Sequence, residues 1–128
     1  MSRTILLIED NEQNAYLVTI LLQPHGYKVI SAPDGPHGLE LARTMRPDLI
    51  LLDIQLPTMD GYAVARGLRA IESLRDVPII AVTSYAMVGD REKAIEAGCT
   101  GYIEKPINPD TFVTEMERSL SHAPRVAP

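Results

Sequence analysis

Short apolar runs alternate with segments of helical periodicity five times along the chain, and this alternation restricts the possible folds more than any other feature. The apolar runs end near residues 8, 32, 53, 83 and 104. Between them, apolar residues recur at intervals of three and four. Strands and helices that alternate in this way form a parallel sheet covered by helices on both faces. We therefore expect an α/β fold with a doubly wound sheet of five parallel strands.

The expected bounds follow from the apolar patterns and from capping residues. Strands are expected at 4–8, 28–32, 49–53, 77–83 and 101–104. Helices are expected at about 12–23, between Asp34 and Pro47, from Asp60 to about Ile71, at about 87–97 and after Asn108. Asn11, Asp34, Asp60 and Asn108 are the expected N-caps or helix starts, and Pro109 is expected to open the last helix. On the first helix, Leu17, Ile20 and Leu21 are expected to face the core.

Size and charge exclude several classes of protein. A chain of 128 residues has the size of one domain. No stretch approaches the roughly 20 apolar residues of a membrane span, and the N-terminus leaves no room for a signal peptide before the first strand. The net charge is −5, and the 12 lysines and arginines are scattered, which argues against nucleic-acid binding. The single cysteine, Cys99, suits a reducing compartment and is expected to be buried. We therefore expect a cytoplasmic protein that does not contact membranes.

Charged side chains follow three of the apolar runs, at the point where each run ends. Glu9 and Asp10 follow the first run, Asp53 ends the third and Lys105 follows the fifth. With the strand order 2-1-3-4-5, which is common in sheets of this type, the switch point lies between strands one and three. The three carboxylates then meet at the carboxyl edge of the sheet, where such folds keep their active sites.

Three crowded carboxylates need either protons or a cation. Two unit charges about 5 Å apart repel by roughly 3 kcal/mol at an effective dielectric constant of about 20. Mg²⁺ prefers oxygen ligands, keeps several waters and is held directly by one or two carboxylates. Asp10 and Asp53 are the expected direct ligands, Glu9 is expected to act through a water, and the backbone carbonyl of Gln55 is a candidate for a third protein ligand.

The same cluster suits phosphoryl transfer. Lys105 can pair with a phosphoryl oxygen, and the hydroxyl of Thr83, at the end of the fourth strand, can donate to another. Asp53 is then a nucleophile that forms an aspartyl phosphate. Each residue also has a purely structural reading: Asp10 as a helix cap, Lys105 as a solvated charge, Thr83 as a strand former. His25, His37 and His122 lie apart from the acids and are expected on the surface.

These motifs together resemble the receiver domains of two-component response regulators. The resemblance covers about residues 4–121 and rests on Glu9-Asp10, on Asp53 in DLILLDIQLPTMDG, on Thr83 in PIIAVTSYA and on Lys105-Pro106 in YIEKPI. It implies a flavodoxin-like (βα)5 fold and Asp53 as phosphoacceptor, with Glu9 and Asp10 as the Mg²⁺ pair and Thr83 and Lys105 as phosphoryl ligands. It further implies a cis Lys105–Pro106 bond and Tyr102 as a switch aromatic, although Tyr102 could also be a core residue.

The resemblance also implies partners. A sensor histidine kinase or a phosphotransfer protein would supply the phosphoryl group, and a downstream protein would read the face of the fourth helix, fifth strand and fifth helix. Ser84, Tyr85, Met87 and Val88 lie in the segment expected to move. The protein is expected to catalyse only its own phosphorylation and dephosphorylation, and to act as a monomer or as a phosphorylation-linked homodimer.

The stretch AMVGDREKAIEAGCTGYIEKPI further resembles stand-alone regulators of the DivK type and receivers attached to hybrid histidine kinases. We expect a receiver domain at 1–121 and a short disordered tail at 122–128, which is too short for an output domain, so that another protein provides the output if the chain is complete.

Three alternatives stay open. A phosphatase of the haloacid-dehalogenase type would need an acid at position 55, where this chain has Gln55. A flavodoxin-like cofactor binder would need a small or hydroxyl-rich first loop, whereas this chain has Glu9-Asp10-Asn11-Glu12 there. A receiver that is not phosphorylated, serving only as a scaffold, would keep the fold without the chemistry.

Overall fold

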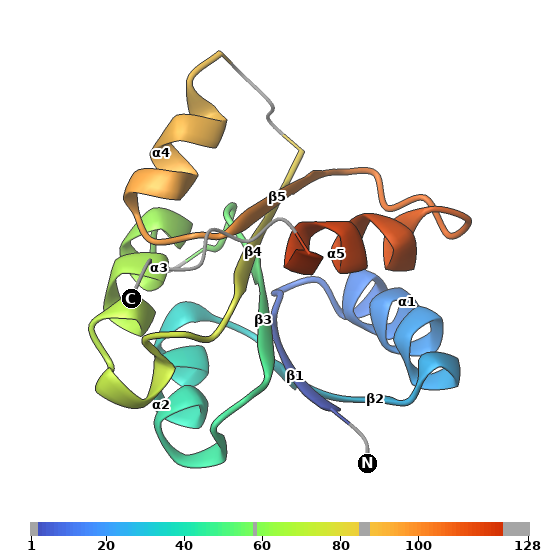
Figure 1. The fold of residues 1–128 in the computed structure, drawn as a ribbon, viewed down its shortest axis with the longest axis horizontal. Coiled ribbons are helices and arrows are strands. Elements are labelled where there is room, and N and C mark those ends of the chain that lie inside the picture. The colour runs from blue at the N-terminus through green and yellow to red at the C-terminus, as the bar shows by residue number, and fades with distance from the viewer. Residues whose placement is uncertain (1–2, 58, 85–87, 122–128) are drawn as a thin grey trace.

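Five parallel strands form one sheet in the order β2-β1-β3-β4-β5, as the sequence predicts (Figure 1). The fold is taken from a computed structural model that describes residues 3–57, 59–84 and 88–121. The strands are β1 (Arg3–Ile8), β2 (Tyr27–Ala32), β3 (Leu49–Asp53), β4 (Ile79–Thr83) and β5 (Gly101–Glu104). The α-helices are α1 (Glu12–Leu22), α2 (Gly35–Met45), α3 (Gly61–Arg69), α4 (Asp90–Glu96) and α5 (Phe112–Ser121). Two 3₁₀ turns, η1 (Gln23–His25) and η2 (Glu72–Leu74), follow α1 and α3.

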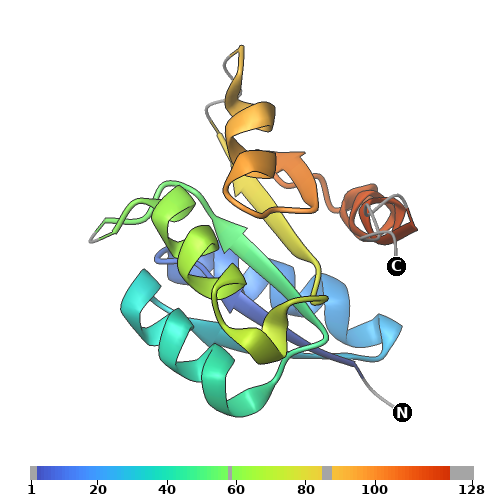
Figure 2. The ribbon, with the colours of Figure 1, turned by 60° about the vertical axis from the view of Figure 1, so that its left-hand side comes forward.

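The helices cover both faces of the sheet and enclose two apolar cores. Helices α1 and α5 lie on one side of the strands, and α2, α3 and α4 lie on the other (Figure 1). In the turned view of Figure 2, α4 and α2 stand near opposite ends of the sheet. Every residue of β3 and β4 is buried. Strands that are apolar throughout their length are typical of a parallel sheet with helices on both faces.

Side-chain caps begin three of the helices where the sequence predicts them. The Asn11 side chain accepts from the N–H of Asn14, and the Asp34 side chain accepts from that of His37. The Asp60 side chain accepts from the N–H of Tyr62 at the start of α3. These bonds satisfy donors that an α-helix leaves without a partner in its first turn. Asp60 is therefore the N-cap of α3, as the sequence predicts.

The buried face of α1 differs from the prediction. Val18 and Leu22 are buried, Leu17 and Leu21 are half-buried, and Ile20 is 44% exposed, so its expected inward position was wrong. Residues four apart share a helix face, whereas a residue two positions from Val18 points to the opposite side. The helix also ends one residue early, because Gln23 begins a 3₁₀ turn that contains Pro24 and that Gly26 closes with a φ of 87°.

Several predicted bounds were wrong by one to three residues. Strand β2 begins at Tyr27, and β4 begins at Ile79 rather than Val77. Among described residues, α4 begins at Asp90, because Gly89 before it has a left-handed φ of 91° that a helix cannot continue; residues 85–87 lie outside the described part. After Asn108, a turn precedes α5, which begins at Phe112. Asn108 still caps this segment, since its side chain accepts from the N–H of Asp110.

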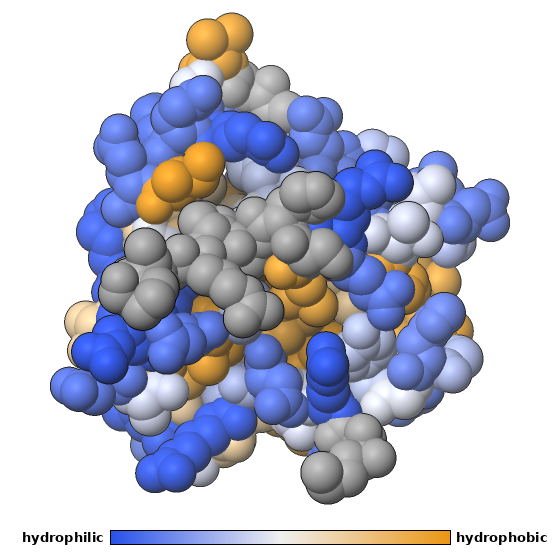
Figure 3. All heavy atoms as spheres, viewed as in Figure 1, coloured by the Kyte–Doolittle hydropathy of each residue, from blue (hydrophilic) through white to orange (hydrophobic). Residues whose placement is uncertain are grey.

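The described surface carries few large apolar side chains. Those that are strongly exposed are Tyr16 and Ile20 on α1 and Val88 and Ile95 at α4. On the face drawn in Figure 3, polar side chains cover most of the described surface, and the apolar ones appear between them in smaller groups. Among the described residues, every helix is too short or too polar to cross a lipid bilayer.

Candidate functional site

Strand register brings the acidic residues together at the carboxyl edge of the sheet. Ile8 of β1 pairs with Leu52 of β3, so the residues that follow them, Glu9 and Asp53, are neighbours across the two strands. Asp53 in turn pairs with Val82, which places Thr83 one step further along β4. The N–H of Lys105 donates to the carbonyl of Thr83 at 2.7 Å, which fixes the chain after β5 at the same edge.

The three carboxylates and one ammonium form a compact cluster. One oxygen from each of Glu9, Asp10 and Asp53 lies within 4.8 Å of the other two. The Nζ atom of Lys105 lies 3.2 Å from Oε1 of Glu9 and 3.4 Å from Oδ2 of Asp53. Glu9 and Asp53 are only 5% and 3% exposed, whereas Asp10 is exposed. The cluster thus opens to solvent on the side of Asp10.

Glu9 carries the strongest electrostatic perturbation of the acidic site. Burial, together with the hydrogen bond and the negative charge of Asp53, raises the pKa of Glu9 from 4.5 to about 7. The ammonium of Lys105 and the N–H of Asn11 lower the same pKa but do not compensate for this rise. Burial is the largest cause of this rise and Asp53 comes second, and a divalent cation bound beside Glu9 would favour its ionised form.

The donor set of the cluster fits Mg²⁺. It consists of carboxylate oxygens with one accessible side, and hard divalent cations prefer such ligands. The N–H of Gln55 donates to Oδ1 of Asp53 at 3.0 Å, so the backbone of Gln55 turns back toward the phosphoacceptor candidate. The Gln55 carbonyl as a further ligand stays a prediction.

The side-chain contacts of Gln55 at this site were not identified by the sequence analysis. Only the backbone of Gln55 was considered there, yet its side-chain Nε2 donates to Oγ1 of Thr83 at 2.5 Å. Its Oε1 accepts from the N–H and the hydroxyl of Ser84, at 3.2 and 2.9 Å. The sequence signal was the pair of hydroxyl residues at the end of β4, Thr83 and Ser84, within reach of a long amide side chain after β3.

The remaining candidates have defined positions. The Lys105–Pro106 peptide bond is cis, as expected. Tyr102 is half-buried on β5, with its ring centroid 5.9 Å from Cζ of Arg91. Val88, before α4, is exposed, whereas Tyr85 and Met87 lie outside the described residues.

For several other side chains, the structure shows whether the expected structural role is correct. Asn11, not Asp10, caps α1, which leaves the Asp10 carboxylate to the acidic cluster. His25 and His37 are exposed, as expected, and His122 lies outside the described residues. Cys99 is buried, and burial raises the pKa of its thiol to about 11, so it is a neutral packing residue at physiological pH.

Comparison with known proteins gives relatives that extend over the whole domain. Residues 5–117 match the family described as the response regulator receiver domain. The chain is 42% identical over 123 residues to the polar-differentiation response regulator DivK of Brucella anthropi, which covers 96% of this chain and all of that protein. The protein of the same name from Brucella ovis matches with the same identity and coverage.

Solved structures agree with this assignment. A chemotaxis response regulator of Vibrio cholerae superposes with a TM-score of 0.88 at 28% identity, covering 93% of this chain and 99% of that one. The receiver domain of a sensor histidine kinase from Pseudomonas aeruginosa has a TM-score of 0.84 at 38% identity, covering 94% and 99%. That structure has a magnesium ion coordinated in its active-site cleft.

Proposed function

This chain belongs to the family of response regulator receiver domains, and from that premise we propose that Asp53 is its phosphoacceptor. The observation that carries the proposal is the position of Asp53. Its carboxylate ends a buried strand, lies beside two further acids and has Oδ2 3.4 Å from the Lys105 ammonium. Haloacid-dehalogenase and flavodoxin chemistry are set aside because the family match spans residues 5–117.

The transfer step uses the charges of this edge. An oxygen of Asp53 attacks the phosphorus of a phosphohistidine, the new O–P bond forms as the P–N bond breaks, and the imidazole nitrogen keeps the electron pair. Lys105 pairs with one phosphoryl oxygen, and the Thr83 hydroxyl donates to another. We propose a sensor histidine kinase or a phosphotransfer protein as the donor. Loss of the phosphoryl group to water, catalysed by the same residues, resets the protein.

Mg²⁺ is the proposed cofactor. Asp10 and Asp53 would hold it directly, with Glu9 acting through a water and the Gln55 carbonyl as a further ligand. When bound, the ion would offset negative charge on the carboxylates and the phosphoryl oxygens. This proposal is supported by the 4.8 Å cluster of the three acids and by the magnesium ion of the Pseudomonas aeruginosa receiver.

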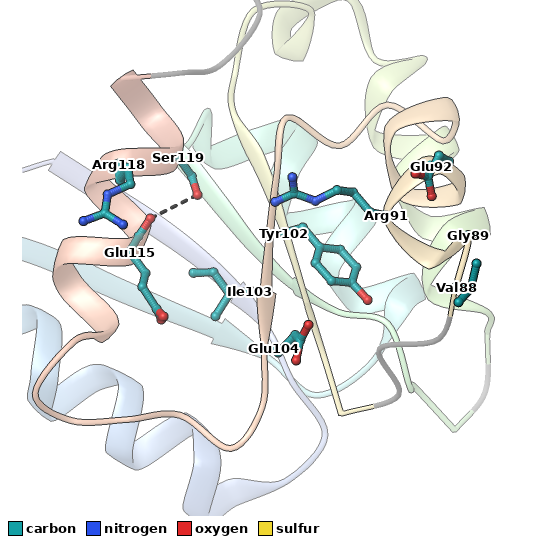
Figure 4. Close-up of a pocket in the computed structure, with 10 residues that line it drawn as sticks. All are labelled: Val88, Gly89, Arg91, Glu92, Tyr102, Ile103, Glu104, Glu115, Arg118 and Ser119. Atoms are coloured by element: carbon teal, nitrogen blue, oxygen red, sulfur yellow. Dashed lines mark hydrogen bonds between the residues drawn. The ribbon is translucent and has the colours of Figure 1, made fainter.

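The proposed output surface is the face of α4, β5 and α5. It contains a groove of about 730 Å³ that is lined by Tyr102 of β5, by Arg91 of α4 beside it and by Arg118 of α5 (Figure 4). Phosphorylation would draw Thr83 toward the phosphoryl group and let Tyr102 turn inward, with Pro106 holding the turn after Lys105. A downstream protein would read the changed groove, in a two-state equilibrium that a covalent charge biases.

We further propose a cytoplasmic regulator whose receiver domain extends over residues 1–121, with 122–128 as a tail. It would act as a monomer or as a homodimer linked to phosphorylation. Its relatives named DivK favour a stand-alone regulator, because the match covers all of their length. The 38% identity to a receiver of a sensor histidine kinase supports an alternative, a receiver module of a hybrid kinase. The mass of the endogenous protein, near 14.1 kDa or far above it, distinguishes these two.

Acetyl phosphate tests the central step without a protein donor. With Mg²⁺ present, intact-mass analysis is expected to show one added phosphoryl group on the wild type and none on Asp53→Asn. Asp76→Asn, which removes an exposed acid far from the cluster in sequence, is the matched control and should label like wild type. Equal labelling of Asp53→Asn, or an unlabelled wild type, would overturn the proposal and favour the unphosphorylated scaffold.

Pull-down with and without beryllofluoride tests the output surface. Tyr102→Ala is expected to lose the partner that the beryllofluoride form of the wild type retains. Tyr16→Ala removes an exposed tyrosine of α1 and serves as the control. Partner capture by Tyr102→Ala at the wild-type level would show that the aromatic step is wrong.

A further inference from the structure

The side chain of Gln55 joins two chain segments that the proposed reaction requires to move relative to each other. Gln55 follows β3, two residues after the phosphoacceptor, and its amide spans to the end of β4. Its Nε2 donates to Thr83 Oγ1, and its Oε1 accepts from both the backbone N–H and the hydroxyl of Ser84. Both the nitrogen and the oxygen of this amide therefore bond to the end of β4, at Thr83 and at the residue that follows it, Ser84.

The direction of these hydrogen bonds is fixed by chemistry. A backbone N–H can only donate, so the atom of Gln55 that faces the N–H of Ser84 must be the carbonyl oxygen. The amide nitrogen is then left to face Thr83, and the Thr83 hydroxyl must accept from it. In this arrangement, one lone pair of the hydroxyl oxygen is engaged by Gln55.

The backbone of the same residue contacts Asp53. The N–H of Gln55 donates to Asp53 Oδ1 at 3.0 Å, so its side chain has a fixed origin beside the phosphoacceptor. Gln55 is half-buried, Thr83 is 2% exposed and Ser84 is exposed. A partly buried amide that makes three hydrogen bonds from an anchored backbone holds its partners in one arrangement.

We propose that Gln55 is a positioning residue that latches Thr83 and Ser84 in the unphosphorylated protein. This inference rests on the proposed function, in which Thr83 turns to a phosphoryl oxygen on Asp53. For that turn, Thr83 and Ser84 must leave the amide of Gln55. The latch then lowers the population of the switched arrangement, and a ligand that needs this arrangement binds more weakly by the same factor.

Beryllofluoride titration in the presence of Mg²⁺ tests the latch in the intact chain. Gln55→Met keeps the length of the side chain and the backbone carbonyl but removes the amide. We expect its half-saturating beryllofluoride concentration to fall about five- to tenfold, the size expected for the loss of one or two hydrogen bonds of ordinary strength. Ser84→Ala, which removes only the hydroxyl bond, should shift it in the same direction by about two- to threefold.

Gln23→Met is the matched control, because Gln23 is exposed and lies in η1, before β2 and hence near the opposite edge of the sheet. It should titrate like wild type. Unchanged or weaker beryllofluoride binding by Gln55→Met would overturn the latch. A wild type that binds no beryllofluoride would instead contradict the proposed function.

A second measurement tests the latch without any phosphoryl mimic. Hydrogen exchange of the Ser84 amide is expected to be faster in unphosphorylated Gln55→Met than in wild type and unchanged in Gln23→Met. Equal exchange in wild type and Gln55→Met would overturn the latch, whatever the proteins bind.

Discussion

Lys105 and Glu9 form an ion pair inside the acidic cluster, with 3.2 Å between Nζ and Oε1 and with both side chains largely buried. The pair does not hold Glu9 in its ionised form at neutral pH. Burial and the neighbouring Asp53 raise the pKa of Glu9 to about 7, above the ordinary 4.5, despite the nearby ammonium. Without a metal, the folded protein therefore keeps a proton on Glu9 over a range of pH in which the unfolded chain has lost it.

This difference predicts a loss of stability with rising pH in the metal-free protein. Between pH 4.5 and about 7 the native state binds more protons at Glu9 than the unfolded state, so the free energy of unfolding falls as pH rises. The contribution of Glu9 is fully present below pH 4.5 and lost above about 7. The shift corresponds to at most about 3 kcal/mol. Urea unfolding at pH 5 and pH 8 with EDTA measures it.

Glu9→Gln isolates the contribution of this residue. The variant should lose most of the stability change between the two pH values and should exceed wild type at pH 8. Glu12→Gln, which removes an exposed acid at the start of α1, three residues after Glu9, should keep the wild-type dependence. A Glu9→Gln variant with the full wild-type pH dependence would show that another group is responsible.

Mg²⁺ is expected to reverse this loss. The ion binds ionised carboxylates, so binding releases a proton from Glu9 and is stronger at pH 8 than at pH 5. At a concentration about 100 times its dissociation constant, Mg²⁺ should raise the free energy of unfolding by about 2.7 kcal/mol. Thermal unfolding with Mg²⁺ and with EDTA at both pH values checks this. Asp10→Asn should abolish most of the gain, and a gain equal at both pH values would contradict the expectation.

Substitution by alanine is expected to affect the free energy of unfolding differently at two glycines of α3. A Cβ at Gly61 would lie 2.4 Å from Cα of Ile54, a backbone atom that cannot move aside. A Cβ at Gly67 would meet only the end of the Leu39 side chain, at 3.0 Å. We expect Gly61→Ala to lower the free energy of unfolding by about 3 kcal/mol. Gly67→Ala should stay within about 1 kcal/mol of wild type, because alanine favours the helix.

Chemical denaturation of the two variants in parallel measures the difference. The same chemical change in the same helix removes effects of helix propensity from the comparison, so Gly67→Ala is the control. Equal stabilities would mean that the loop carrying Ile54 yields to the added methyl group. Since Ile54 directly follows Asp53, Gly61→Ala should also weaken beryllofluoride binding.

The positions of the strands could be predicted because they depend on local patterns, and the acidic cluster then followed from the strand order that is common in sheets of this type. Apolar runs such as Leu49–Leu52 place the strands, and parallel pairing then brings the residue after each run to the same edge. This reasoning was enough to place four charged residues at that edge: Glu9, Asp10, Asp53 and Lys105. The caps at Asn11 and Asp34 were equally local, since each side chain bonds an N–H three residues on.

Features that depend on side-chain reach between segments could not be predicted. The amide of Gln55 finds Thr83 because β3 and β4 are neighbours and the loop after Asp53 turns back, and neither fact is written in the residues around Gln55. The start of α4 was misplaced for a related reason: Gly89 adopts a left-handed conformation, whereas the apolar spacing around it is compatible with a longer helix. Ile20 was misplaced because α1 is apolar on more than one face.

The guanidinium of Arg69 donates hydrogen bonds to several backbone carbonyls at once. It donates through Nε and Nη2 to the carbonyl of Gly98, at 3.1 and 2.7 Å, and through Nη1 to three carbonyls in the loop before β4. These bonds tie the end of α3 to the turns that precede β4 and β5. Arg69→Met should lower the free energy of unfolding by about 3 kcal/mol, because several carbonyls lose a charged donor. Arg69→Lys should recover less than half of this loss, since an ammonium lacks the planar fork of donors.

Arg66→Met, at an exposed position one turn earlier, is the control and should be nearly neutral. Full recovery by lysine would show that the positive charge, rather than the geometry of the guanidinium, stabilises this junction.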